Sequence, residues 1–273
     1  MSHIQQSQYS KNQQGAVLIV VLLFLVLIVL AGAIAVRQST TDLRLSTSDQ
    51  INALLLQSAD NANQNIEQTI NSDSRSEIYK DMMSISGPFG HFILDADSFD
   101  HEYVFCFRPR GRFFDINKAS ILTSSGTVLS SNDNNGYCNP SEPADYVSKR
   151  NASMTQVNIS LTPPNSENEA FGSYTIGQDS SEISSQAFIF DINSTAVLPA
   201  YADTKVGSDN CFEQTSRIHT VSDSAKTIGG CMAEAGVPST VVYEQVNVEN
   251  QSLRTKCVDF GKGDGKLCTL PSS

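Results

Sequence analysis

The chain has 273 residues, of which 40% are hydrophobic, and its formal net charge is −11 at pH 7. This length fits one or two domains, and the hydrophobic share excludes a chain that is disordered by composition. The acidic balance repels phosphate backbones and so argues against direct nucleic-acid binding. The only candidate basic patch is formed by Arg108, Arg110 and Arg112, for which a strand-turn edge with ion pairs is the simpler interpretation.

An uncharged apolar run over residues 16–36 follows a short polar leader that ends at Gly15. As an α-helix this run would span about 32 Å, which matches a bilayer core of about 30 Å. In lipid the backbone must satisfy its own hydrogen bonds, so helix is expected despite the many Val and Ile residues. The sequence therefore predicts one membrane-spanning helix.

Three interpretations of how this run is processed stay open. A secretory signal peptide cleaved after Ala35 is one, although the run is longer than a usual signal core. An uncleaved single-span anchor is the second, and cleavage after Gly15, which keeps the whole apolar helix, is the third. Lys11 on one side, against Arg37 and Arg44 on the other, does not decide the orientation.

The helical pattern continues beyond the apolar run, because no Pro or Gly occurs between Ala33 and Ser86. One helix of roughly 50–65 residues is predicted, with residues 37–84 as its amphipathic half. This half needs a partner surface, most simply the domain that follows; a coiled coil is the alternative, but the pattern is not a clean heptad. The predicted apolar stripe consists of Leu55, Ala59, Ala62, Ile66 and Ile70.

From about His91 the pattern changes to short strand-like runs between loops rich in Ser, Asn, Gly and Pro. The runs cover residues 103–107, 154–161, 187–192 and 241–248. They predict that residues 85–273 form a β-rich head, an antiparallel sheet with long loops laid against the helix. The expected fold class is therefore α+β.

Six cysteines, all after the apolar run, indicate an oxidising compartment and up to three disulfides. None has the short Cys/His spacing of a zinc site. Because disulfides require an oxidising compartment, the head should face the periplasm or the outside while the N-terminus stays in the cytoplasm. Sequence proximity favours the pairs Cys106 with Cys138, Cys211 with Cys231, and Cys257 with Cys268.

No residue pattern in the chain predicts catalysis. The four histidines are scattered, and no arrangement of a hydrolase nucleophile with its partners is visible. Acidic turns at residues 95–100, 133–136 and 264–265 lack the complete EF-hand loop and are interpreted as ordinary turns, which leaves calcium open. We therefore expect no enzyme activity, no cofactor and no dedicated metal site.

The leader, the apolar helix and the disulfide-bearing head together resemble a type IV prepilin with a class III signal. More narrowly, the chain resembles the PilX-type minor pilins of bacterial type IV pili, of the Acinetobacter-like subgroup. The resemblance covers residues 1–160 and is weak beyond them. It is carried by residues 13–22 (QQGAVLIVVL), 34–39 (IAVRQS), 102–109 (EYVFCFRP), 136–139 (GYCN) and 154–157 (MTQV).

This resemblance implies that prepilin peptidase cleaves after Gly15 on the cytoplasmic face and that the new N-terminus, Ala16, is N-methylated. Residues 1–15 would be the leader. The protein would span the inner membrane once, with its head in the periplasm, and then enter the pilus at the cell surface. The implied partners are the prepilin peptidase, the inner-membrane assembly platform, the major pilin, other minor pilins and a tip adhesin. The implied outputs are adhesion, twitching motility and DNA uptake.

Two positions depart from the pattern of the family. Many pilins begin the mature chain with Phe or Met, where this chain has Ala16. Most carry Glu at the fifth mature position, where it pairs with the N-terminal amine of a neighbouring subunit. This chain has Val20 there, and its first acidic residue is Asp42.

A carboxylate in an apolar bundle is costly unless it is paired, and a subunit without one need not neutralise a neighbour above it. The pseudopilin that caps the type II secretion pseudopilus lacks the same carboxylate. We therefore expect a minor pilin that primes pilus assembly and lies at or near the tip. Alternatives are a poorly incorporated subunit, a type II secretion pseudopilin, and a periplasmic binding domain on a single-pass anchor.

Overall fold

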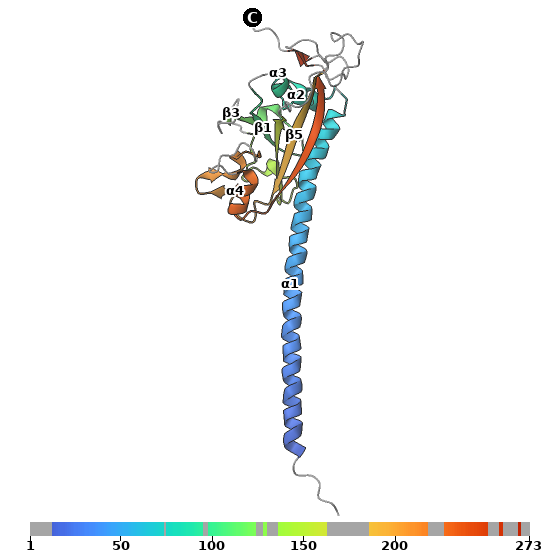
Figure 1. Ribbon diagram of the computed structural model, residues 1–273, viewed down its shortest axis with the longest axis vertical. Helices are drawn as coiled ribbons and strands as arrows, with labels where there is room; N and C mark the ends of the chain where they lie inside the picture. The colour runs from blue at the N-terminus through green and yellow to red at the C-terminus, as the bar shows by residue number, and fades with distance from the viewer. Residues whose placement is uncertain are drawn as a thin grey trace, which may run out of the picture. The chain divides into compact units, whose positions relative to one another are not determined.

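The computed structural model describes residues 13–73, 75–94, 98–123, 128–129, 136–162, 186–217, 227–250, 257–258 and 267–268. The chain divides into two units, one up to Ile51 and the other from Asn52 onward. The described elements comprise one long helix, an antiparallel sheet and several short helices (Figure 1). This arrangement confirms the predicted α+β class.

Helix α1 (Gln13–Ile70) has 58 residues, a length within the predicted range. The predicted end at residue 84 is wrong, because the chain turns after Ile70. In the turn, the backbone N–H and the hydroxyl of Ser72 both donate to the carbonyl of Thr69, at 3.1 and 2.7 Å. Short polar side chains that bond the nearby backbone compete with continuation of a helix. Ser76 then caps a separate helix, α2 (Glu77–Met83).

Six strands form the sheet in the order β3-β2-β1-β4-β5-β8, and every pairing is antiparallel. All four predicted strand-like runs lie on strands of this sheet, whereas β2 and β3 were not predicted. The last two strands are longer than predicted, and they pair with each other along their whole lengths. The strands are β1 (Glu102–Cys106), β2 (Ala119–Leu122), β3 (Val128–Leu129), β4 (Met154–Leu161), β5 (Gln186–Val197) and β8 (Ser239–Asn250).

Within the second unit, the predicted apolar stripe of α1 packs on one face of the sheet. Leu55, Ala59, Ala62 and Ile66 are at most 1% exposed. Hydrogen bonds accompany this packing: the Ser58 and Thr155 hydroxyls lie 2.8 Å apart, and the Ser194 hydroxyl donates to the Asn63 side-chain oxygen. These bonds join α1 to β4 and β5.

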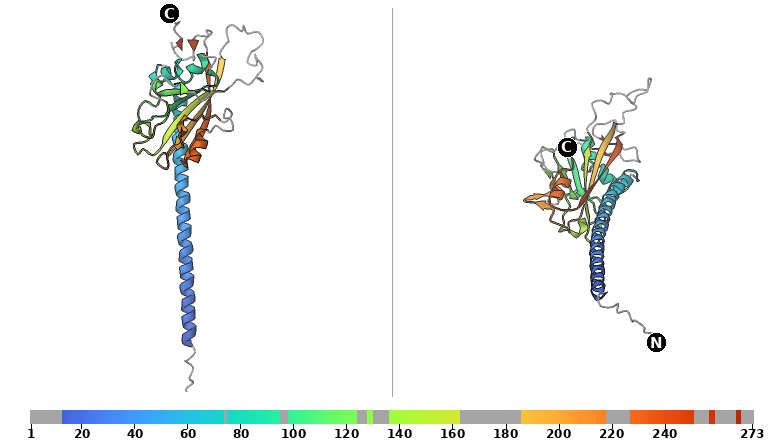
Figure 2. Two further views of the ribbon diagram at one scale, coloured as in Figure 1. Left: turned by 90° about the vertical axis from the view of Figure 1, so that its left-hand side faces the viewer. Right: turned by 60° about the horizontal axis from the view of Figure 1, so that its bottom comes forward.

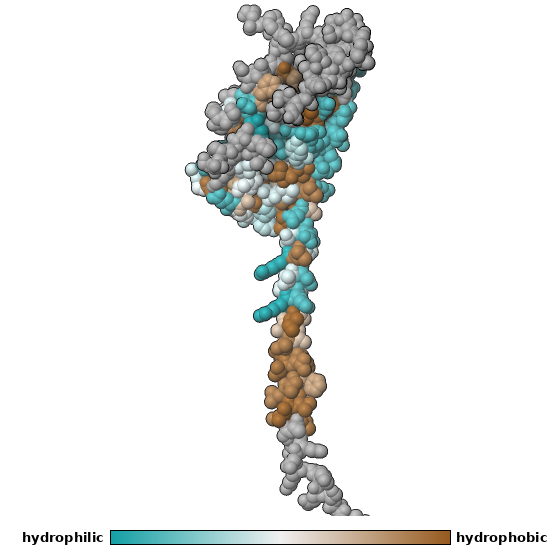
Figure 3. Space-filling view, viewed as in Figure 1, coloured by the Kyte–Doolittle hydropathy of each residue, from teal (hydrophilic) through white to brown (hydrophobic). Residues whose placement is uncertain are grey.

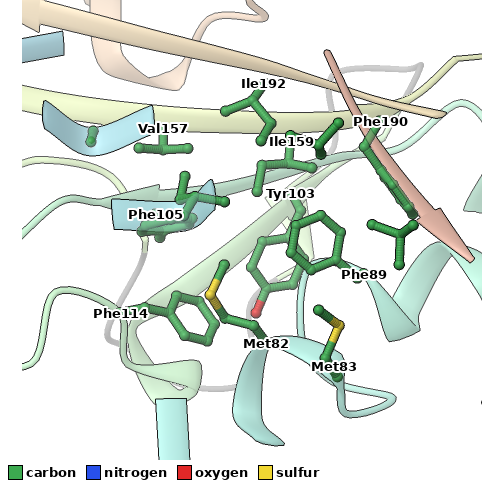
Figure 4. Packing of buried hydrophobic residues seen from close by; sticks show 14 of the residues in the cluster. Met82, Met83, Phe89, Tyr103, Phe105, Phe114, Val157, Ile159, Phe190 and Ile192 are labelled. Atoms are coloured by element: carbon green, nitrogen blue, oxygen red, sulfur yellow. The ribbon is translucent and has the colours of Figure 1, made fainter. Parts of the chain in front are cut away.

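Aromatic and methionine side chains fill the space between this face and the short helices (Figure 4). Phe89 packs edge-on against Phe190 of β5, with ring centroids 5.0 Å apart. Phe105 of β1 meets Phe114 at the same centroid distance, 5.0 Å. Each large side chain buried in this way contributes about 1.5–3 kcal/mol, so this cluster is the main apolar core of the head.

The opposite face of the sheet is covered by a second apolar cluster. Met154 and Cys106 on the sheet pack with Phe212 and Met232 from the segment that follows β5. That segment carries β6 (Lys205–Val206), β7 (Asp209–Asn210) and α4 (Ile228–Glu234). Because both faces of β4 are covered, all eight of its residues are buried, and the alternation in its sequence does not separate core from surface.

Two glycines provide a test of the close backbone packing around α3 (Gly90–Leu94). A Cβ on Gly90 would lie 2.1 Å from the carbonyl oxygen of Ser84, whereas a Cβ on Gly111 would meet nothing within 4 Å. We expect Gly90→Ala to lower the free energy of unfolding by about 2–3 kcal/mol, and Gly111→Ala to change it by less than about 0.5 kcal/mol. Denaturant unfolding of the full chain in detergent measures both. Equal effects of the two substitutions would contradict the packing described around α3.

Candidate functional site

The first candidate site is the N-terminal part of α1. Gly15 and Ala16 lie in the first turns of the helix, and the side chain of Ala16 is outside the described part of the chain. The large apolar side chains from Val17 to Val36 are 50–68% exposed, which makes a continuous apolar surface on this unit (Figure 3). This is the one helix in the described part of the chain that is long and apolar enough to cross a membrane. Single-pass anchoring is therefore consistent with the structure.

Val20 lies within this apolar surface and is 52% exposed. No charged residue occurs in α1 before Arg37, and the first acidic residue is Asp42. The apolar segment itself therefore offers no carboxylate to a neighbouring helix or to an amine.

The helix changes character after the apolar segment. Residues 37–51 are almost all exposed, and the Thr40 and Thr41 hydroxyls each donate to the carbonyl of Arg37 at 2.9 Å. The Thr47 hydroxyl donates to the carbonyl of Leu43 in the same way, at 2.8 Å. These bonds satisfy polar side chains from within the helix. Arg37 thus marks the change from a lipid-compatible to a water-compatible helix surface.

Two of the three predicted disulfides are present in the head. Cys106 bonds to Cys138, and Cys211 bonds to Cys231, with sequence separations of 32 and 20 residues. All four cysteines are at most 2% exposed. Loop closures of these lengths stabilise the folded state by about 3–4 kcal/mol each in the chain-entropy model. The disulfides therefore serve the structure of the head.

The backbone also brings together the third predicted pair. In the antiparallel pair of β9 (Cys257–Val258) and β10 (Leu267–Cys268), Cys257 lies directly opposite Cys268. Opposed residues of an antiparallel pair have Cα atoms about 4.5–5.5 Å apart, which suits a disulfide. The side chains lie outside the described residues, so this bond stays a prediction.

Two of the three arginines are ion-paired and the third bonds to backbone carbonyls, which confirms in part the simpler interpretation. Arg108 Nε donates to Asp145 Oδ1 at 2.6 Å, and Arg112 Nη2 donates to Asp81 Oδ2 at 2.5 Å. Arg110 donates to the backbone carbonyls of Pro143 and Tyr146. These guanidinium groups are used within the protein, so they do not form a basic patch for phosphates.

Two histidines that are ten residues apart come together between α3 and β1. The Nε2 atom of His91 lies 3.1 Å from Nδ1 of His101, and the two rings stack. No group of three metal-ligating side chains occurs in the part of the chain that the structure describes. Of the predicted acidic turns, residues 95–97, 133–135 and 264–265 lie outside that part.

The sequence did not point to Glu102, a fully buried carboxylate on β1. It accepts hydrogen bonds from the Asn158 amide at 3.1 Å, the Thr215 hydroxyl at 2.8 Å and the Ser216 backbone N–H at 2.9 Å. Its place in the strand alternation offers a signal, because Glu102 shares a face with the buried residues Val104 and Cys106. Glu102 ties residues 215–216 to the sheet through neutral donors.

Three carboxylates on α1 and on the last strand of the sheet interact electrostatically. Burial raises the pKa of Glu244 on β8, and the charges of Glu67 and Asp60 on α1 raise it further. Because these negative charges repel one another, a cation placed beside them would be favourable.

Comparison with known protein families, characterised proteins and solved structures finds no match for this chain.

The buried hydrogen bonds of Glu102 are expected to stabilise the head. We expect Glu102→Gln to lower the free energy of unfolding by about 2 kcal/mol, because an amide cannot accept from all these donors and points its own N–H groups at them. Glu142→Gln is the matched control, since Glu142 is exposed. Thermal unfolding of the full chain in detergent measures both, and equal melting temperatures would refute the role of Glu102.

Proposed function

We propose that this protein is a minor pilin of the PilX type, a single-pass membrane subunit that joins a helical filament and primes its assembly. The observation that carries the proposal is α1: an exposed apolar segment continues in one helix into an amphipathic segment that packs on an antiparallel sheet. The two buried disulfides support an extracytoplasmic head. The resemblance of residues 1–160 to minor pilins supplies the family.

Such a subunit works by moving its apolar helix from lipid into contact with other helices. The exposed apolar surface of residues 17–36 is costly in water and must be covered by lipid or by other apolar helices. When the subunit leaves the inner membrane and enters the filament, protein contacts replace the lipid contacts. The head remains outside the bilayer throughout.

Processing after Gly15 fits this mechanism, because it removes the polar leader and leaves an apolar helix that begins at Ala16. In the structure the helix begins at Gln13, before the junction. Glycine inside a helix costs about 1 kcal/mol relative to alanine. Gly15 therefore makes the junction easier to unwind for the prepilin peptidase.

Val20 supports a place at or near the pilus tip. Pilins in the body of a filament use a carboxylate at this position toward a neighbouring amine, and this helix has none before Asp42. A subunit at the end of the filament has no neighbour above it to neutralise. In this proposal its partners are other minor pilins, the major pilin and a tip adhesin, and its outputs are adhesion, twitching motility and DNA uptake.

A second candidate, a periplasmic binding domain on a single-pass anchor, is favoured by one observation. An open groove of about 450 Å³ lies between α1 and the loop before β4. Its lining includes Leu54, Asn61, Val147 and Ser153. The N-terminus of the mature protein separates the two candidates, because an anchor keeps its leader.

We expect Gly15→Val to block processing, because a branched side chain replaces the glycine at the proposed cleavage junction. Gly32→Val is the matched control in the same helix, since a Cβ at Gly32 meets nothing within 4 Å. The intact mass and N-terminal sequence of the protein from producing cells are measured. The parent and the control should begin at Ala16, and the variant should keep its leader.

A mature N-terminus at another residue would support a different interpretation. A parent chain that starts at Met1 supports the anchor, and one that starts at Val36 indicates a secreted protein. Cleavage of the Gly15→Val variant at Ala16 would refute the class III signal.

We expect Val20→Glu not to raise the number of pili, because a subunit at the tip has no amine above it to pair with the new carboxylate. An unpaired charge in the bilayer costs about 2.5–3.5 kcal/mol on insertion scales. Val21→Glu is the control, since Val21 has nearly the same exposure, 53%. Pili are counted by electron microscopy. More pili with Val20→Glu, but not with Val21→Glu, would contradict the tip placement.

A further inference from the structure

Strand β8 ends the six-stranded sheet, next to β5 (Figure 2). It pairs with β5 over all 12 residues, from Ser239 opposite Val197 to Asn250 opposite Gln186. In the part of the chain that the structure describes, no strand pairs with its other edge. Among the described residues, β8 therefore has one long edge without a paired strand.

The backbone groups at this free edge follow from the register. The N–H of Leu198 donates to the carbonyl of Pro238 at 3.1 Å, which makes these two residues a hydrogen-bonded pair just before the strand. Such pairs alternate along an antiparallel ladder, so residues 240, 242, 244, 246 and 248 bond to β5. Residues 241, 243, 245 and 247 consequently direct their N–H and C=O groups toward the free edge.

The side chains of these four edge residues are exposed on the outer face of the sheet. Val241 is 46% and Tyr243 is 55% exposed, so the edge carries an apolar and aromatic surface. The Tyr243 hydroxyl and the Gln245 amide both donate to Asp191 Oδ1, at 2.6 and 2.8 Å. These bonds order the outer face beside the edge.

The strand carries one of the features that usually protect an edge, the charge of Glu244 on its inner face, and lacks most of the others. Natural edges are blunted by short strands, Lys, Pro or bulges. Residues 239–250 contain no Lys, Arg or Pro, and a typical strand has only about 5–6 residues. This composition suits an edge that accepts another strand.

The charged residues of β8 indicate which kind of strand could pair with its free edge. The only charged residues of β8 are Glu244 and Glu249. Glu244 lies on the inner face, where it interacts with the carboxylates of Glu67 and Asp60. A residue of an added strand opposite Glu244 would be in a non-hydrogen-bonded pair, in which side chains approach closely. A cation is favourable there, whereas a second copy of β8 would add glutamates to the cluster.

We propose that the free edge of β8 binds an extended segment of a partner protein that carries Lys or Arg toward Glu244. Its alternate residues are β-branched or aromatic and lie beside Val241 and Tyr243. Backbone hydrogen bonds supply affinity, and the alternating side chains supply specificity. This proposal does not depend on the filament proposal.

The test uses the full chain in non-ionic detergent and a fluorescein-labelled nine-residue peptide in which Lys alternates with Val. Gln245→Pro removes one N–H from the free edge and leaves the pairing with β5 intact, because proline is tolerated on that side of an edge strand. Gln245→Ala is the matched control, since it loses the same side chain and keeps the N–H. Fluorescence anisotropy, corrected for protein-free micelles, measures binding.

We expect the peptide to bind the parent and Gln245→Ala at least about ten-fold more tightly than Gln245→Pro. A peptide with Glu in place of Lys should bind the parent at least about ten-fold more weakly, and Glu244→Gln should weaken binding of the Lys peptide several-fold. Asn247→Pro with Asn247→Ala repeats the comparison at the next edge position if Gln245→Pro lowers the melting temperature.

The proposal is overturned if the Lys peptide does not bind the parent, or if it binds the proline variants as tightly as the alanine variants. Equal binding of the Lys and Glu peptides would overturn the basic partner. Self-association of the parent that Gln245→Pro abolishes would show a second copy at the edge and would also overturn the proposal. None of these outcomes bears on cleavage after Gly15.

Discussion

The seam between α1 and the sheet is the contact on which the head depends. Ala59 and Ala62 present small buried side chains to the sheet, and Leu55 and Ile66 are buried beside them. Within this apolar seam, Ser58 and Asn63 reach hydroxyl groups on β4 and β5. Rotating or sliding the helix would leave those polar groups buried without these partners, which costs about 1–3 kcal/mol each. Apolar burial holds the helix on the sheet, and the hydrogen bonds fix its rotation and its position along the sheet.

In the described part of the chain, the sheet is covered unevenly. The inner face lies under α1 and the aromatic core, while the disulfide-closed segment after β5 covers the outer face of β1 and β4. Glu102 pins part of that segment to the sheet. Helix α4 of that segment reaches β8 beside Val241, yet Val241 and Tyr243 remain 46% and 55% exposed. In the part of the chain that the structure describes, no strand pairs with the outer edge of β8.

Much of this fold follows from local sequence patterns. The length of α1 and the four long strands could be predicted because helical and strand periods persist over many residues. The end at Ile70 was missed because the turn uses Asn, Ser and Asp and contains no Gly or Pro. Strands β2 and β3 were missed because two to four residues carry too little pattern.

Some features of the candidate sites could also be predicted from the sequence, whereas others could not. Gly15, Ala16 and Val20 are visible in the sequence because their significance depends on position along one helix. The Glu102 network and the carboxylates around Glu244 join segments far apart in the chain. Strand order, and hence the identity of the free edge, depends on long-range pairing that no local pattern contains.

In the proposed filament, exchanging lipid for neighbouring apolar helices changes the hydrophobic free energy little, because lipid tails are as apolar as Val and Leu side chains. In most pilins a carboxylate in this segment adds a directional interaction. This chain has Val20 instead, so its apolar helix can hold the subunit in a bundle but offers no charge to define its neighbour. The choice of partner must then come from the head. The free edge of β8, with its ordered backbone groups and its flanking carboxylates, is the described surface best suited to make that choice.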